Sequence, residues 1–185
     1  IPERKEERAE NVPDELAVLD ARFLEKPSFA VQISRDTVIK MAEISGDALQ
    51  LATELLQDYN ENKAKLVESM EQRVDRYEDA LGTYLLKVSN LDLSQNDSRM
   101  LSILLHCIND FERISDHAVN IRDSAVEMHE KDISITSGGM EEMAVYSKAV
   151  QDIVQQTIQA FRTGDLTLAR QVEPFEEVID GLSIE

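Results

Sequence analysis

The sequence predicts an all-α protein made of repeated antiparallel three-helix bundles, the second of them incomplete. Turn signals are rare, since only six glycines and four prolines interrupt 185 residues. Between them lie long runs of Ala, Leu, Glu, Gln, Met and Arg, which have high helix propensity. Apolar residues recur every three or four positions through most of the chain, as is typical of amphipathic helices.

Composition and charge narrow the function classes. With 37 acidic and 19 basic residues, the formal net charge is -18. Such acidity disfavours nucleic acid as a partner, because its phosphates would be repelled. No apolar run approaches the length needed to cross a bilayer. Cys107 is the single cysteine, which excludes an intrachain disulfide and favours a reducing compartment.

The first part of the chain is interpreted as a tether, a strap and a bundle. Residues 1–15 have the charged, Pro-punctuated composition of a linker. Residues 16–33 are interpreted as an ordered strap that packs on the bundle, because Pro27 would interrupt a helix there. Residues 34–130 are assigned to a first three-helix bundle, with helices over about 34–59, 63–88 and 98–129.

A second bundle is predicted after a connector. Residues 131–139 form the connector, with turn chemistry at 137–139. Residues 140–185 are assigned to the first two helices of the second bundle, over about 140–162 and from 166 onward. Gly164 is the expected C-terminal cap of the first of these.

An internal repeat supports this division. Shifting the sequence by 105 positions, the difference between 176 and 71, aligns Glu71 and Asp75 with Glu176 and Asp180. Each repeat would hold three helices, yet the sequence contains only two of the second set. We therefore expect a third helix beyond Glu185 in the native protein, and the start at Ile1 likewise suggests a piece of a longer chain.

Acidic residues are placed four apart within apolar helices. Glu112 and Asp116 lie on one face of the helix predicted over 98–129, beside its apolar stripe. Glu71 and Asp75 repeat the spacing on the helix over 63–88. Stepping by about 100° per residue puts both pairs next to the buried faces, so four carboxylates could converge if the two helices are neighbours.

Two interpretations of these carboxylates stay open. Four converging carboxylates without sulfur or imidazole suit hard or borderline cations such as Mg, Mn, Ca or Fe. The alternative is that each pair belongs to a solvated helix face. His106 and His117 lie on another side of their helix, and the Glu-x-x-His spacing of di-iron bundles is absent. No nucleophile and base motif predicts catalysis, so we expect no enzyme.

The run ERISDHAVNI, residues 112–121, resembles the third-helix motif of PhoU-like proteins, which carries a Glu-x3-Asp signature within Glu-Arg and Asn-Ile. The pairs at 71–75 and 176–180 resemble the second-helix motifs of the same family. This resemblance covers about residues 35–185. Upstream, LDARFLEKP at 19–27 is similar to the juncture before the PhoU-like domain of bacterial sodium/phosphate cotransporter-type membrane proteins.

The resemblance implies a regulatory domain of a sodium/phosphate cotransporter-like protein, at the cytoplasmic face of the plasma membrane, that modulates phosphate uptake. Its partner would be the transmembrane portion of the same polypeptide or a separate transporter, and association between copies of the chain stays open. The alternatives are a free-standing PhoU-type adaptor of phosphate transport signalling and a carboxylate-bridged metalloenzyme.

The resemblance also implies metal clusters of divalent or trivalent cations, with Fe, Mn, Zn and Mg as candidates. A second cluster, of whose four carboxylates only two are present in this sequence, should bind metal weakly or not at all. The expected ligands are Glu71, Asp75, Glu112 and Asp116 for one cluster, and Glu176 and Asp180 for the second.

Overall fold

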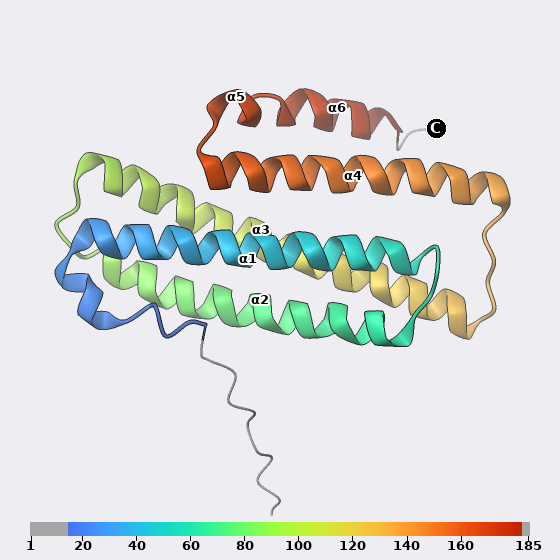
Figure 1. Ribbon diagram of the computed structural model, residues 1–185, viewed down its shortest axis with the longest axis horizontal. Coiled ribbons are helices and arrows are strands. Elements are labelled where there is room, and N and C mark those ends of the chain that lie inside the picture. Colours follow the sequence, from blue (N-terminus) through green and yellow to red (C-terminus); the bar gives the residue numbers. More distant parts are fainter. Residues whose placement is uncertain (1–14, 183–185) are drawn as a thin grey trace, which may run out of the picture.

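The computed structural model describes residues 15–182 (Figure 1). No strand occurs in this range, and the prediction of an all-α fold is confirmed. The predicted linker lies outside the described residues except for Glu15. The elements in chain order are η1 (Ala21–Glu25), α1 (Pro27–Leu55), α2 (Glu61–Val88), α3 (Gln95–Glu130), α4 (Ser137–Thr163), α5 (Leu166–Ala169) and α6 (Val172–Leu182).

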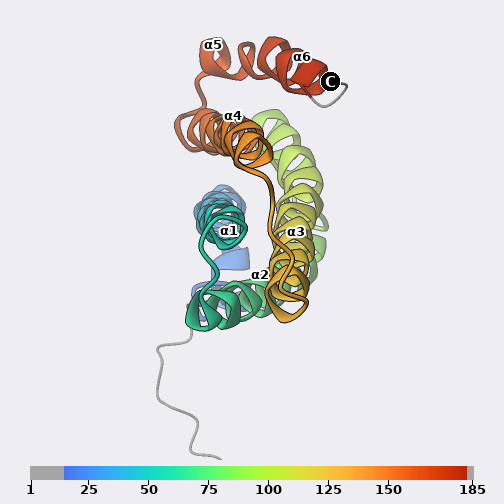
Figure 2. The same cartoon turned by 90° about the vertical axis from the view of Figure 1, so that its right-hand side faces the viewer.

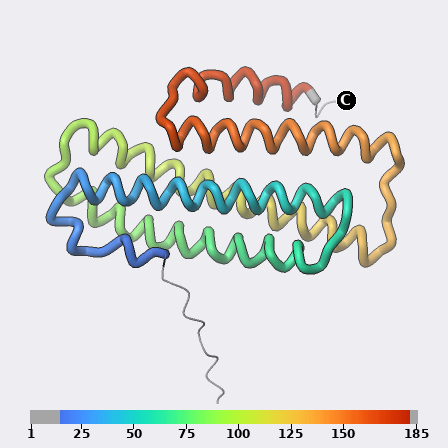
Figure 3. Tube along the Cα trace, viewed as in Figure 1, coloured from blue at the N-terminus to red at the C-terminus, as the bar shows by residue number. Residues whose placement is uncertain are grey.

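The long helices run back and forth, reversing at short connections (Figure 3). Helices α1, α2 and α3 all pack against one another, α4 packs on α1, and α6 packs on α4. Viewed from the end of the bundle, α1 has α2, α3 and α4 on three of its sides (Figure 2). None of the helices within residues 15–182 combines the length and apolar character that crossing a membrane requires.

The central position of α1 follows from its small side chains. Ser34 and Ser45 are fully buried and donate to the carbonyl oxygens of Ala30 and Met41, so their hydroxyls are satisfied within the helix. Gly46 faces α4 with no side chain at all. Small residues on several sides let three neighbouring helices approach α1 closely.

The core of the first three helices is filled by large apolar side chains. Burying such side chains is the main favourable term in folding. The helical periodicity of the sequence predicts this set well, because its members recur at three and four. The largest fully buried apolar examples are Met41 and Leu55 of α1, Tyr77, Leu81 and Leu85 of α2, and Leu104 of α3.

Three helix boundaries differ from the prediction. Helix α1 begins at Pro27 and not near residue 34. Proline is tolerated at the first helical position, because the backbone N–H that it lacks would have no acceptor within the helix there. Helix α4 begins at Ser137, inside the predicted connector, with Thr136 accepting from the Gly139 N–H. The helix predicted from residue 166 is two pieces, α5 and α6, separated at residues 170–171.

Residues 15–20 lie along α2 as a strap, and η1 after them packs on α1. The Glu15 carboxylate accepts a hydrogen bond from the Tyr77 hydroxyl at 2.6 Å and another from Arg73 at 2.7 Å. Further along, the Tyr84 hydroxyl donates to the carbonyl oxygen of Asp20 at 3.2 Å. These contacts fasten the strap to the helix that also carries Glu71 and Asp75. Leu16, Leu19 and Leu24 pack against the core beside them.

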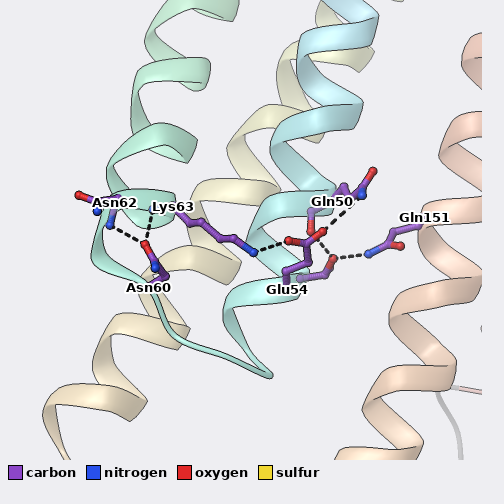
Figure 4. A network of polar contacts seen from close by, with 7 residues as sticks. Gln50, Glu54, Asn60, Asn62, Lys63 and Gln151 are labelled. Atoms are coloured by element: carbon purple, nitrogen blue, oxygen red, sulfur yellow. Dashed lines mark hydrogen bonds and ion pairs between the residues drawn. The ribbon is translucent and has the colours of Figure 1, made fainter.

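A polar network ties the end of α1 to α2 and α4 (Figure 4). The Lys63 ammonium of α2 donates to Glu54 of α1 at 2.7 Å. The Gln151 amide of α4 donates to the Thr53 hydroxyl at 2.5 Å. Asn60 begins α2 by accepting from two backbone N–H groups of its first turn. The second half of the chain is therefore anchored to the first by polar as well as apolar contacts.

Candidate functional site

The two Glu-x3-Asp pairs of the first bundle meet across the contact between α2 and α3. These helices are joined by a short connection and run antiparallel, so the order of residues along one opposes that along the other. The negative charge of Asp116 on α3 acts on both Glu71 and Asp75 of α2. Glu112 is in turn affected by Asp75. The structure therefore brings together the four residues that the sequence selected.

Repulsion and partial burial both act on these groups. Partial burial raises the pKa of Glu71 above its ordinary value, and the charges of Asp75 and Asp116 raise it further. Burial followed by the charge of Asp116 also raises the pKa of Asp75. The cluster thus holds its negative charge at a cost in free energy that a bound cation or proton would relieve.

Glu78 joins the cluster although the sequence prediction did not include it. It is half-buried on α2. Its pKa is raised by burial first, then by the charges of Asp79, Asp75 and Asp116. Glu78 lies three residues after Asp75, which puts it on the same side of the helix. That spacing was visible in the sequence and is the signal that could have added it.

Glu112 and Asp116 interact directly. Burial makes the largest contribution to the raised pKa of Glu112, and the charge of Asp116 and a hydrogen bond with it contribute further. A hydrogen bond that raises this pKa means that a protonated Glu112 donates to the Asp116 carboxylate. The two carboxylates therefore lie close together on one face of α3.

Arg122 is a cation next to the cluster that sequence reasoning missed. Its guanidinium on α3 lies 3.2 Å from Asp123 and 4.0 Å from Glu68, and its charge lowers the pKa of Glu71. The Arg122 Nε is buried without a hydrogen-bond partner among the described residues. The positive charge of Arg122 therefore offsets part of the negative charge of the cluster near Glu71, but not near Asp75 and Glu112. Only the register between α2 and α3 reveals this contact.

Glu176 and Asp180 lie elsewhere. They are exposed on α6, which packs on α4. Both views place α6 on the opposite side of the molecule from α2 (Figures 1 and 2). The pair is therefore separate from the α2–α3 carboxylates.

The donor chemistry of the α2–α3 cluster fits a hard cation, because every contributing group offers carboxylate oxygen. Zinc is a poorer match than Mg, Mn or Fe, since it favours nitrogen and sulfur ligands. Within residues 15–182, however, no three Asp, Glu, His or Cys side chains are preassembled as a metal site. Cation binding would therefore require these carboxylates to change rotamer, which their exposed or half-buried positions permit.

The histidines stay apart from the carboxylate cluster. His106 and His117 are exposed on α3. His129, in the last turn of α3, stacks on Tyr59 with ring centroids 4.1 Å apart.

Residues 38–125, which include every residue of the α2–α3 cluster, match the PhoU domain family model. The chain is also 26% identical over 150 residues to a "Phosphate-specific transport system accessory protein PhoU homolog" from Aquifex aeolicus (strain VF5). That match covers 80% of this chain and 66% of the relative's length. No solved structure matches the chain.

Proposed function

Because residues 38–125 match the PhoU domain family model, we propose that the chain is a PhoU-like protein that regulates phosphate transport. The name of the Aquifex aeolicus relative, an accessory protein of a phosphate-specific transport system, supports this role. The role is that of a regulator and not of an enzyme.

The working site in this proposal is the group of carboxylates on α2 and α3. One observation carries it: five carboxylates from two helices act on one another within the PhoU domain, and burial and mutual repulsion raise the pKa of four of them. A multivalent cation would relieve that repulsion and pull α2 and α3 together. The proposed ligands are Glu71, Asp75, Glu112 and Asp116, with Glu78 as an additional donor. The cation would be Mg, Mn or Fe, with Zn less favoured.

A second, weaker cation site is proposed on α6. Glu176 and Asp180 have the same spacing as Glu71 and Asp75 and are exposed. Two carboxylates alone bind a cation poorly, so its affinity should fall well below that of the α2–α3 cluster.

Two arrangements with the transporter follow from this role. In the first, the chain is the regulatory domain of a sodium/phosphate cotransporter-like protein, at the cytoplasmic face of the plasma membrane. In the second, it is a free-standing adaptor that binds a separate transporter. The name of the Aquifex aeolicus relative, an accessory protein, favours the second arrangement. Membrane-spanning segments encoded upstream in the same gene would support the cotransporter-like arrangement.

Phosphate uptake in cells that lack the gene tests the regulatory role. Restoring the unaltered gene should restore normal control of uptake, whereas Asp116→Asn should not, at an equal protein level. Asp92→Asn is the matched control, because Asp92 is an exposed aspartate in the α2–α3 connection. Full restoration by Asp116→Asn would refute a role of the carboxylates, and no effect of the gene on uptake would refute the regulatory role itself.

A further inference from the structure

Arg122 is a positive charge that the protein itself places beside the α2–α3 carboxylates. Its side chain is only 18% exposed, and its guanidinium lies 4.0 Å from Glu68 of α2 and 3.2 Å from Asp123 of its own helix. Its charge also acts on Glu71, whose pKa it lowers. One guanidinium therefore acts on three carboxylates at one end of the cluster.

The other end of the cluster is different. The pKa values of Asp75, Glu78 and Glu112 are raised by burial and by neighbouring carboxylates, and no positive charge among the described residues counters this effect. A cation from solution would therefore be attracted most strongly to this end. Near Glu71 the same cation would be repelled by Arg122.

Arg122 acts on its neighbours through charge more than through hydrogen bonds. The 4.0 Å from its guanidinium to Glu68 is longer than a hydrogen bond. Its buried Nε donates to no residue between 15 and 182. A guanidinium that tied α2 firmly to α3 would instead use its donors in pairs on one carboxylate. The side chain can therefore give way when another cation takes over the neutralisation of Glu71.

We propose that Arg122 is an internal counter-ion that competes with the metal ion for Glu71 and so limits the affinity of the cluster for cations. The inference rests on the cation site proposed above and concerns the regulation of that site. A bound divalent ion and the guanidinium are both positive, so each disfavours the other beside Glu71. Arg122 is thus a positioning residue, which directs the metal ion toward Asp75 and Glu112.

A purely structural ion pair would have the opposite effect on cation binding. If Arg122 only held α2 and α3 together, its loss would separate the carboxylates of the two helices and weaken binding. If Arg122 competes with the metal ion, its loss strengthens binding. The direction of the change in affinity therefore distinguishes the two roles.

Titration calorimetry of the full chain with Mn²⁺, in a buffer without phosphate or other divalent cations, measures this direction. Arg122→Gln should bind Mn²⁺ at least about fivefold more tightly than the unaltered chain. Arg122→Lys keeps the charge and should stay within about twofold of the unaltered affinity. Arg99→Gln is the matched control, because it removes the same charge from an exposed position of α3, about 20 Å before Glu112 along the helix.

A second substitution tests whether the competition takes place at Glu71. Glu71→Gln should weaken Mn²⁺ binding more when it is added to Arg122→Gln than when it is made in the unaltered chain, because Arg122 then no longer repels the metal ion from Glu71. Circular dichroism verifies that each variant stays helical. Arg122→Met, which is also neutral, replaces Arg122→Gln if that variant does not fold.

The outcomes separate this inference from the proposed function. Binding of Mn²⁺ by Arg122→Gln that is no tighter than by Arg99→Gln would overturn the inference and leave the cation site standing. An equal gain in Arg122→Lys and Arg122→Gln would also overturn it, since the loss of charge would then not be the cause. Absence of Mn²⁺ binding in the unaltered chain and in each variant would refute the cation site itself, and the inference with it.

Discussion

Gly46 of α1 lies so close to Ile158 of α4 that a Cβ added to the glycine would be 2.7 Å from the Ile158 Cδ1. Ile158 is buried at this crossing. The absence of a side chain at position 46 therefore sets how closely the second half of the chain packs on the first.

Gly46→Ala should destabilise the protein by about 1 kcal/mol. Overpacking of a buried contact costs about 1–3 kcal/mol, and the higher helix propensity of alanine returns about 1 kcal/mol. Adding Ile158→Val should recover the loss, because valine lacks the Cδ1 that the new methyl group meets. The measurement is urea unfolding of the single and double variants.

Gly82→Ala is the control for helix propensity. A Cβ at Gly82 of α2 meets nothing within 4 Å, so this substitution should stabilise by up to about 1 kcal/mol. A similar gain at Gly46 would contradict the close approach of α1 and α4.

Glu15→Gln should loosen the strap. It removes the charge from a carboxylate that accepts hydrogen bonds from Arg73 and Tyr77. Because Glu15 and Arg73 are partly exposed, the expected loss is modest, about 1 kcal/mol or less. Limited proteolysis should cut the strap sooner in this variant. Asp92→Asn, which changes charge far from the strap, should leave the cleavage rate unaltered.

The same contact predicts an effect on the titration of tyrosine. Burial and then the hydrogen bond to Glu15 raise the pKa of Tyr77 to about 12. Glu15→Gln removes the carboxylate charge and should bring this pKa down toward 10. Ultraviolet titration of the tyrosines measures it, and an unchanged profile would argue that Glu15 does not contact Tyr77 in solution.

The carboxylate cluster predicts that mild acid stabilises the protein. The folded-state pKa values of Glu71, Asp75, Glu78 and Glu112 are raised, so the folded state binds protons more tightly than the unfolded state. Stability should therefore rise as pH falls from neutral toward the ordinary value of 4.5.

Glu15 and Glu54 predict the opposite trend at lower pH. Their pKa values are lowered by hydrogen bonds from Arg73 and Lys63, so their contributions are lost as pH falls below 4.5. The melting temperature should therefore pass through a maximum in weak acid. Asp116→Asn should reduce the pH dependence of the melting temperature above the pH of that maximum, and should not alter its decrease at lower pH. A rise equal to that of the unaltered chain would argue against coupling across α2 and α3.

Much of this architecture could be predicted from the sequence because it depends on local patterns. Apolar spacing located α2 and α3 and most residues of their core, although it assigned Leu66 to the buried side of α2, where Val67 is buried and Leu66 is exposed. The turn at Gly164, with its positive φ of 68°, ended α4 as expected. Pro27 was misleading, because proline stops a helix in its interior but is compatible with its first turn. To tell whether Pro27 stops a helix or begins one, one must know what residues 21–26 contact.

The candidate site, too, could be predicted only in the part that depends on local spacing. Glu71, Asp75, Glu112 and Asp116 share a spacing that sequence alone reveals, and helical stepping indicated that they could converge if the two helices are neighbours. Arg122 could not be predicted, because its contact with Glu68 depends on the register between two packed helices. The break between α5 and α6 was missed as well, since the apolar spacing of the segment continues across it.

Thermal unfolding with and without Mn²⁺ tests the central claim, that the α2–α3 carboxylates form one cation-binding unit. At a hundredfold excess over the dissociation constant, Mn²⁺ should stabilise the unaltered chain by about 2.7 kcal/mol. Asp116→Asn should lose most of that gain, since Asp116 acts on every other member of the cluster, and Asp92→Asn should keep it. The same stabilisation by Mn²⁺ in Asp116→Asn as in the unaltered chain would contradict the claim.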